Sequence, residues 1–310
     1  MNISLIIPTY LRPQFLIDCV DSVLEGSLLP NHLFISCRFD DEPTSKVAET
    51  LKQKYADQKT IITIVPIYQS GHIPPIEEAL KLVTDDITVI LDDDTRVDKT
   101  WLQELVQPLS DENIACVGGQ VATPYYPTPI LKGQPGRFSF YGRLWGNLGW
   151  YMPDHIIEVD TVMEGNSSWK TNLLKSVKLD TLFTEDESPN YGLFLTLSLK
   201  KRGYRILYNS AAKIDHFIAP RDGHIKRDYS RLYYSQRNYI YLVFRFLPWY
   251  KKTLYTFWSF FIGDKIVIGI VSFLYLVLTG NHQWRQLIRP SIKGRIDGIR
   301  AYRKFIRKEQ

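Results

Sequence analysis

Three consecutive carboxylates, Asp92, Asp93 and Asp94, stand where an apolar run of the sequence ends. That run, Ile-Thr-Val-Ile-Leu over 87–91, favours a buried β-strand. Because side chains alternate along a strand, Asp92 and Asp94 can face the same way where the strand leaves the sheet. Like charges this close repel unless a cation lies between them, and Mg²⁺ and Mn²⁺ prefer carboxylates together with phosphate oxygens. The spacing therefore predicts a clamp for a metal ion and a diphosphate, although a solvated acidic turn would explain these three residues alone equally well.

The elements that must position this triplet alternate between predicted strands and predicted helices. Short runs of apolar and β-branched residues predict strands over Ile3–Pro8, Leu33–Cys37, Ile61–Ile67 and Ile87–Leu91. Apolar residues at helical spacing between these runs predict helices over 13–24, Thr44–Tyr55 and Pro75–Val83. Such alternation is typical of an α/β fold with a mostly parallel, doubly wound sheet flanked by helices. Three of the strands run into Thr9, Asp40 and Asp92, so we expect one ligand-binding edge at their carboxyl ends.

The following part of the sequence is less regular. Strands are predicted over Ile114–Val121 and Tyr204–Tyr208, and a helix over Leu193–Lys201. Residues 122–155 are rich in proline, glycine and aromatic residues, which favours a long loop over a site. The aromatic side chains of this loop could stack on a sugar or lipid, or could form a small core of their own; they include Trp145, Trp150 and Tyr151.

Five segments of the chain occur in the order and spacing of a known family. They are Ser4–Arg12 (SLIIPTYLR), Asp40-Asp41, Leu91–Asp94 followed by Trp101-Leu102, Glu164–Asn166, and Lys201–Ile206. In these segments the chain resembles the family-2 glycosyltransferases, which are inverting enzymes with the GT-A fold. The resemblance covers roughly residues 3–218 and depends on the five segments together rather than on any one of them.

The resemblance implies a nucleotide-sugar donor, with UDP, dTDP or GDP as its nucleotide, and a divalent cation, Mg²⁺ or Mn²⁺. A divalent cation can stabilise the charge that develops on a leaving diphosphate, so the chemistry of the acidic triplet agrees with this. The metal site would consist of Asp92, Asp94 and His216, although a lone histidine such as His216 is more often structural. The donor site would include Pro8, Thr9, Tyr10, Arg12, Asp40, Asp41, Asp92 and Asp93, and the acceptor site Glu164, Gly165, Asn166 and Trp169.

Two registers, that is, two ways of aligning the chain with the family, place the catalytic base at different residues. The family usually carries a Glu-Asp pair shortly before the Gly-Tyr that matches Gly203-Tyr204, and that register gives Tyr191-Gly192 here. Counted forward from Leu179-Asp180, the pair is Glu185-Asp186 instead, which implies a short insertion in this segment.

We expect Asp186 to be the base that deprotonates the acceptor hydroxyl, with Glu185 and Glu187 as alternatives. An acidic helix N-terminus would account for all three carboxylates without any catalytic role, because carboxylates are favoured at that end of a helix dipole. A second departure from the family is Ile76-Glu77, where Arg-Asn is common, and it puts that donor contact in doubt.

Charge is unevenly distributed along the chain. Residues 1–220 carry 20 Lys and Arg against 28 Asp and Glu, a net charge of −8, whereas residues 221–310 carry 18 against 5, a net charge of +13. The basic residues of the second segment flank apolar and aromatic runs, which favours an anionic membrane surface over nucleic acid as partner. We therefore expect a GT-A catalytic domain over 1–220 and a basic, aromatic-rich, helical, membrane-associating region over 221–310.

The segment Leu254–Thr279 is apolar enough to enter a membrane but is interrupted by Gly263-Asp264-Lys265. An Asp-Lys pair at mid-depth in a bilayer is costly, so we expect a bent segment in the membrane interface; a hairpin packed on the catalytic domain is the alternative. The three cysteines lie singly, which indicates a reducing compartment, and the first residues do not resemble a signal peptide. These features predict the cytoplasmic face of the plasma membrane.

The expected function is sugar transfer, hexosyl or deoxyhexosyl, from a nucleotide-diphosphate sugar to a lipid-linked or membrane-proximal glycan acceptor in cell-surface polysaccharide synthesis. A catalytically degenerate, glycosyltransferase-like binding or scaffold subunit is a second interpretation, because one register lacks the base. A sugar-phosphate nucleotidyltransferase is a third, although Pro8–Arg12 contains no glycine of the phosphate loop that such enzymes carry.

Overall fold

The computed structural model describes residues 1–125, 135–146, 148–149, 156–183, 188–217, 229–282 and 284–309. The chain forms two compact units. The sheet unit comprises Met1–Arg137, Gly146–Lys178 and Leu195–Pro220, and the helical unit comprises Phe138–Trp145, Leu179–Phe194 and Arg221–Gln310. The helical unit thus contains the expected C-terminal region together with two short segments from earlier in the chain.

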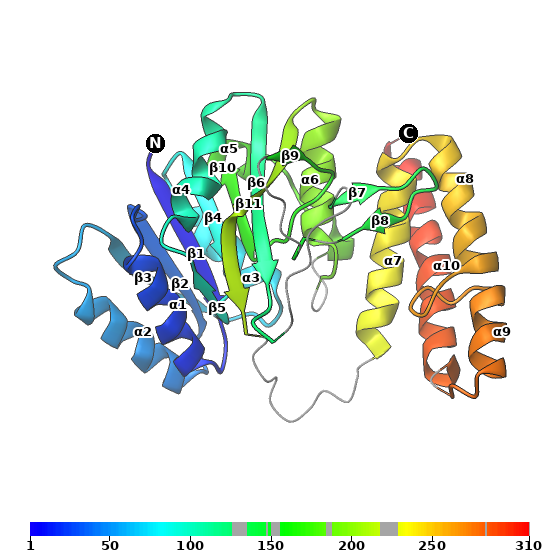
Figure 1. Ribbon diagram of the computed structural model, residues 1–310, viewed down its shortest axis with the longest axis horizontal. Helices are drawn as coiled ribbons and strands as arrows, with labels where there is room; N and C mark the ends of the chain where they lie inside the picture. Colours follow the sequence, from blue (N-terminus) through cyan, green and yellow to red (C-terminus); the bar gives the residue numbers. More distant parts are fainter. Residues whose placement is uncertain are drawn as a thin grey trace. The chain divides into compact units, whose positions relative to one another are not determined.

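One half of the large sheet is parallel. It consists of β1 (Ile3–Thr9), β2 (His32–Arg38), β3 (Ile61–Ile67) and β4 (Ile87–Leu91), in the order β3-β2-β1-β4 (Figure 1). In the centre of this half, Ile6 of β1 lies opposite Phe34 of β2 and Ile90 of β4. All four strands lie within one residue of their predicted bounds.

The other half of the sheet is mixed, which agrees with the expectation of a mostly, but not fully, parallel sheet. Its strands are β5 (Thr95–Val97), β6 (Ile114–Ala122), β9 (Ile157–Glu158), β10 (Asn166–Lys170) and β11 (Arg205–His216). β10 lies antiparallel between β4 and β6, and β11 runs parallel to β6. A strand of this kind was not expected at 166–170, because its sequence, Asn-Ser-Ser-Trp-Lys, is too polar to predict a buried strand.

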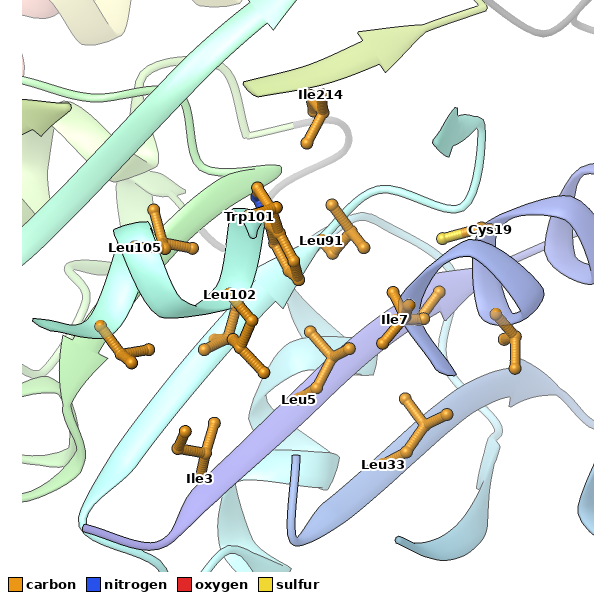
Figure 2. Packing of buried hydrophobic residues seen from close by; sticks show 14 of the residues in the cluster. Ile3, Leu5, Ile7, Cys19, Leu33, Leu91, Trp101, Leu102, Leu105 and Ile214 are labelled. Carbon is orange, nitrogen blue, oxygen red and sulfur yellow. The ribbon is translucent and has the colours of Figure 1, made fainter. Parts of the chain in front are cut away.

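Helices cover both faces of the parallel half of the sheet. Side chains alternate along β1 between the two faces of the sheet. On one face, Leu5 and Ile7 pack with α1 (Pro13–Leu24), α2 (Glu42–Lys54) and α4 (Trp101–Val106). On the opposite face, Ile6 packs with α3 (Ile73–Leu82). Figure 2 shows Trp101, Leu102 and Leu105 of α4 over the apolar side chains of β1 and β4. The remaining short elements are η1 (Gln107–Ser110), β7 (Arg137–Phe138), β8 (Leu144–Trp145), α5 (Thr171–Lys175), η2 (Thr181–Phe183) and α6 (Tyr191–Lys201).

The helical unit is built on two long helices, α7 (Tyr229–Phe246) and α10 (Trp284–Glu309), which pack side by side (Figure 1). A Cβ atom at Gly298 would lie 2.3 Å from the carbonyl oxygen of Arg237, so glycine permits the close approach of α10 to α7. The hairpin between them consists of α8 (Trp249–Phe257), the π-helical turn η3 (Trp258–Ile262) and α9 (Ile270–Leu278). In the described part of the chain, no helix combines the length and the apolar character needed to cross a membrane.

Candidate active site

The three residues predicted to bind a metal ion lie together at one edge of the sheet. Asp92 and Asp94 follow β4, and His216 is the last residue of β11. One ligand atom from each of the three lies within 4.8 Å of the other two, and His216 Nε2 is 3.1 Å from Asp94 Oδ1. His216 also pairs through its backbone with Thr95 of β5, so the sheet fixes its position. Two carboxylates and an imidazole are ligands that Mn²⁺ or Mg²⁺ accepts, with the remaining positions open to phosphate oxygens or water.

The electrostatics of this cluster favour a bound cation. Loss of solvation raises the pKa of Asp92, and the negative charge of Asp94 raises it further, whereas His72, His216 and Arg12 oppose the shift. The hydrogen bond to Asp94 raises the pKa of His216 above its ordinary value, despite the opposing effect of burial. Ionised carboxylates in such surroundings repel each other, and a divalent cation between them would relieve that repulsion.

Asp93, the middle residue of the triplet, points to a different partner. Its carboxylate accepts a hydrogen bond from Arg12 Nη1 at 2.8 Å, and the same nitrogen lies 3.3 Å from Asp94 Oδ2. Asp93 is 3% exposed, and burial raises its pKa to about 6 although Arg12 and the Thr9 hydroxyl lower it. Arg12 therefore ties the start of α1 to the acidic triplet. The donor-binding roles predicted for Arg12 and Asp93 remain predictions.

Gly165 makes room for the Asp92 carboxylate. A Cβ atom at this position would lie 2.1 Å from Asp92 Oδ2, far inside van der Waals contact. The backbone is tied at the same place, because the Asp92 amide donates to the Gly165 carbonyl at 3.1 Å. The segment that contains Gly165 was assigned to the acceptor side; the structure places it directly against a predicted metal ligand.

Asn166 holds that segment to three other elements. Its carboxamide is buried and accepts a hydrogen bond from Trp101 Nε1 at 2.8 Å. It donates to the carbonyl oxygens of Gln120 at 3.0 Å and Ala212 at 3.1 Å. Through these bonds Asn166 joins α4, β6 and β11 behind the acidic triplet, and this network fixes the neighbouring Gly165.

The sequence comparison decides the family. The profile described as "Glycosyltransferase like family 2" matches residues 1–238, well over half of the chain. The chain is a family-2 glycosyltransferase. The family expected from the sequence segments is thereby confirmed, and no curated protein matches the sequence significantly.

Solved structures show the same fold at low sequence identity. TarS 1–349 of S. aureus is 14% identical with a TM-score of 0.58, and the match covers 100% of this chain and 92% of that one. The mannosyltransferase PcManGT from Pyrobaculum calidifontis, solved with GDP-Man and Mn²⁺, is 14% identical with a TM-score of 0.60, covering 97% and 84%. GalNAc-T7, solved with UDP, GalNAc and Mn²⁺, is 13% identical with a TM-score of 0.63, covering 82% and 50%. These likenesses confirm the expected GT-A-like α/β fold with a mostly parallel sheet.

The residues predicted to hold the donor base and ribose lie at the ends of β1 and β2. Pro8 and Thr9 end β1, and the exposed Tyr10 follows. The two predicted carboxylates of the β2 end differ in their surroundings. Asp41 is buried, accepts from the amide of Thr44 at 3.1 Å and from that of Leu11, and thereby caps α2. Asp40 pairs with Arg38 but is exposed, and because of that exposure a ligand can reach it.

An aromatic and cationic cluster at this edge of the glycosyltransferase was missed by the sequence reasoning. Phe39 and Tyr68, which follow β2 and β3, stack with ring centroids 5.2 Å apart, and both are exposed. The guanidinium of Arg38 lies 4.7 Å from the ring centroid of Tyr10. Aromatic residues just beyond predicted strands were the available signal, because successive strand ends of a parallel sheet lie side by side. His72, which acts on Asp92 through its charge, was missed as well.

The two remaining residues assigned to the acceptor side differ in exposure. Glu164 is partly exposed, and its carbonyl accepts from the Ser167 hydroxyl at 2.7 Å. Trp169 is fully buried, and its ring nitrogen donates to Ser167 Oγ at 2.8 Å. Trp169 therefore supports the sheet in this structure, and contact with an acceptor remains a prediction for both residues.

The predicted base and part of the aromatic loop lie outside the described residues. Asp186, Glu185 and Glu187 fall in one gap, and Trp150 and Tyr151 in another. Trp145 is described and belongs to the helical unit, where Arg143 lies 5.0 Å from its ring centroid. The assignment of Asp186 as base accordingly remains a prediction.

Proposed function

We propose that this glycosyltransferase moves a hexosyl or deoxyhexosyl group, with inversion, from a nucleotide-diphosphate sugar to a hydroxyl of a lipid-linked or membrane-proximal glycan. The observation that supports this most strongly is the convergence of Asp92, Asp94 and His216 at one end of the parallel sheet. A diphosphate bound through a cation there would direct the nucleoside along the strand ends towards Tyr10, Asp40 and the Phe39–Tyr68 pair.

The proposed reaction is a direct displacement at the anomeric carbon. The acceptor oxygen forms a bond to that carbon while the bond to the diphosphate oxygen breaks, and the nucleoside diphosphate leaves. The acceptor proton passes to a carboxylate, for which Asp186 is our choice, with Glu185 and Glu187 as alternatives. Asp92, Asp94 and His216 would hold a divalent cation, which when bound supplies positive charge to the leaving diphosphate.

The residues around the triplet keep these groups in place. Arg12 binds Asp93 and Asp94, so that Asp94 keeps its orientation before the donor arrives. Asp41 fixes the turn after β1 through the amide of Leu11, next to the exposed ring of Tyr10. Such prior positioning lowers the free energy needed to reach the reactive arrangement.

The proposed cellular setting is polysaccharide synthesis at the cytoplasmic face of the plasma membrane. Its support is the net charge of +13 over residues 221–310 and the apolar surface of the helical unit described below. A lipid-linked acceptor would then be present at the same surface as the enzyme.

The test is release of nucleoside diphosphate from a panel of UDP-, dTDP- and GDP-sugars, with Mn²⁺ and a lipid-linked glycan acceptor. We expect one donor to be consumed and EDTA to abolish the reaction. The Asp94→Ala variant should lose about 10²-fold or more, since a metal site supplies several kcal/mol of charge stabilisation. The matched control is Asp18→Ala, which removes a carboxylate paired with Arg96 on the surface of the same unit and should leave turnover unchanged.

Three results would contradict the proposal. Full activity in EDTA would exclude the metal clamp. Nucleotide binding without turnover of any donor would favour a degenerate binding subunit. Pyrophosphate release from a nucleoside triphosphate and a sugar phosphate would favour a nucleotidyltransferase.

A further inference from the structure

The helical unit exposes a large apolar surface on α8, η3 and α9. Of the 26 exposed large hydrophobic residues in the described part of the chain, 13 fall between Trp249 and Leu278. On α9 they recur at helical spacing along one face, at Ile270, Val271, Leu274, Tyr275 and Leu278. On α8 and η3 a second face carries Trp249, Tyr250, Leu254, Phe257 and Phe261, with the last two rings stacked at 4.8 Å.

These two faces belong to one hairpin. Gly263 and Ile268 form a β-bridge that closes the turn, and η3 packs against α9. Arg295 of α10 is fully buried beneath the hairpin, where its guanidinium donates to the carbonyl of Ile268 at 2.5 Å and to that of Ser259. Burial lowers the pKa of Arg295 to about 10, so it remains charged at neutral pH. Within this unit, α8 packs against α7 and α9 packs against α10 (Figure 1).

The charge of the hairpin is suited to an anionic partner. Asp264 is the only acidic residue between 249 and 296. Its carboxylate lies 2.8 Å from Arg143 Nη2, and it also accepts from the amides of Ile266 and Val267. The positive charge of Arg143 therefore compensates that of Asp264. Lys265 beside it is exposed, and the exposed side of α10 carries Arg285, Arg289 and Lys293.

The lengths of the helices exclude a membrane-spanning hairpin. A spanning helix needs about 20 residues, because each residue advances only about 1.5 Å across an apolar layer of about 30 Å. Together α8 and η3 have 14 residues, and α9 has 9. Apolar and aromatic helices that are too short to span, with basic residues beside them, can instead lie in the plane of the membrane interface.

We propose that the exposed face of α8, η3 and α9 docks on an anionic lipid bilayer and lies in the interface of one leaflet without spanning it. Docking by this face would bring the protein to the membrane that carries the acceptor of the proposed function, but the docking itself does not depend on catalysis. Its test below measures binding alone, so it can fail while glycosyl transfer holds, and the reverse.

The experiment is co-sedimentation of the full-length protein with vesicles of phosphatidylcholine, alone or with phosphatidylglycerol. The test variant is Leu274→Glu on α9, and the matched control is Leu82→Glu on α3 of the sheet unit, because these leucines are 51% and 52% exposed. We expect Leu274→Glu to weaken binding at least about tenfold, since it removes an exposed leucine that the membrane would bury and places a charge in the interface. Leu82→Glu should bind like wild type.

Lipid charge and depth give two independent readouts. Lys265→Glu should reduce the preference for phosphatidylglycerol while leaving binding to phosphatidylcholine unchanged, and high salt should weaken binding without abolishing it. Brominated lipids should quench tryptophan fluorescence less in Trp249→Phe than in wild type, because Trp249 is 77% exposed on the docking face.

Three outcomes would overturn the proposal. One is a wild-type protein that stays in the supernatant with both kinds of vesicle. Another is equal binding of Leu274→Glu and Leu82→Glu. The third is a wild-type dimer that Leu274→Glu dissociates with no change in vesicle binding, which would assign the face to a second copy of the chain. Circular dichroism and thermal melting confirm that each variant is folded before these comparisons are made.

Discussion

Gly165→Ala should inactivate the enzyme by moving one predicted metal ligand. The added Cβ would lie 2.1 Å from Asp92 Oδ2, whereas ordinary contact begins at 3.4 Å, so the carboxylate or the backbone must shift by 1.3 Å. Gly165 has no positive φ angle, so alanine is compatible with its backbone conformation. A displacement of about 1 Å in a catalytic arrangement can cost about 10²-fold in rate, and we expect a loss of that size in turnover.

The assay combines turnover, Mn²⁺ affinity and urea denaturation. We expect the apparent Mn²⁺ dissociation constant of Gly165→Ala to rise by about 10- to 100-fold, as for other changes next to metal ligands. The free energy of unfolding should fall by about 1–3 kcal/mol, because the substitution overpacks a tight site. Gly146→Ala is the control, since a Cβ there meets no atom within 4 Å.

A double-mutant cycle separates the clash from a general loss of folding. In an Asp92→Ala background the clashing oxygens are absent, so Gly165→Ala should there cost little further stability. Equal costs in both backgrounds would refute the reasoning. Wild-type turnover and Mn²⁺ affinity in the single variant Gly165→Ala would refute it more directly.

Three further predictions concern other parts of the site. Asp186→Asn should lower turnover by about 10²- to 10⁴-fold with donor binding preserved. Loss of turnover in Glu185→Gln or Glu187→Gln instead would assign the catalytic base to the neighbouring residue. Unchanged turnover in all three variants would mean that the segment is structural. In EDTA, Asp93 should contribute a fall of up to about 3 kcal/mol in the free energy of unfolding between pH 4 and pH 6. Its folded pKa is raised to about 6 from 3.8, so its stabilising protonated form is lost as pH rises. The urea-denaturation profile of Asp93→Asn should lack this contribution. Asn166→Ala should lower the free energy of unfolding by about 3 kcal/mol, measured the same way, because it leaves three buried partners without their hydrogen bonds.

The parallel half of the fold was predictable because its signals are local. The runs Ile61–Ile67 and Ile87–Leu91 are apolar and bounded by turn residues, and both are strands with those bounds. The spacing of Asp92 and Asp94 at such a strand end placed them on the ligand edge, and His216 joined them from the residues after Gly203.

The antiparallel strand β10 could not be predicted in the same way. Its polar residues are buried because partners from distant elements satisfy them, as Trp101 and the Gln120 carbonyl do for Asn166. Such long-range pairing leaves no periodic pattern in the strand itself. The same holds for Gly165, whose closeness to Asp92 depends on the pairing of β10 with β4.

For the apolar segment Leu254–Thr279, the sequence predicted the bend but not which side chains are exposed or paired. Composition indicated a bend at Gly263-Asp264-Lys265, and the structure has a turn there. The sequence could not indicate that Arg143, more than a hundred residues away, neutralises Asp264. Nor could it separate exposed from buried apolar residues, because that depends on the packing of α9 against α10.

The most direct test of the central claim is a crystal structure of the protein with Mn²⁺ and its nucleoside diphosphate, recorded with anomalous scattering from manganese. The account predicts one anomalous peak bounded by the carboxylates of Asp92 and Asp94 and the imidazole of His216, with diphosphate oxygens completing the coordination. The nucleobase should lie beyond the end of β1. A nucleotide bound at this edge without manganese, or manganese bound away from these three residues, would contradict it.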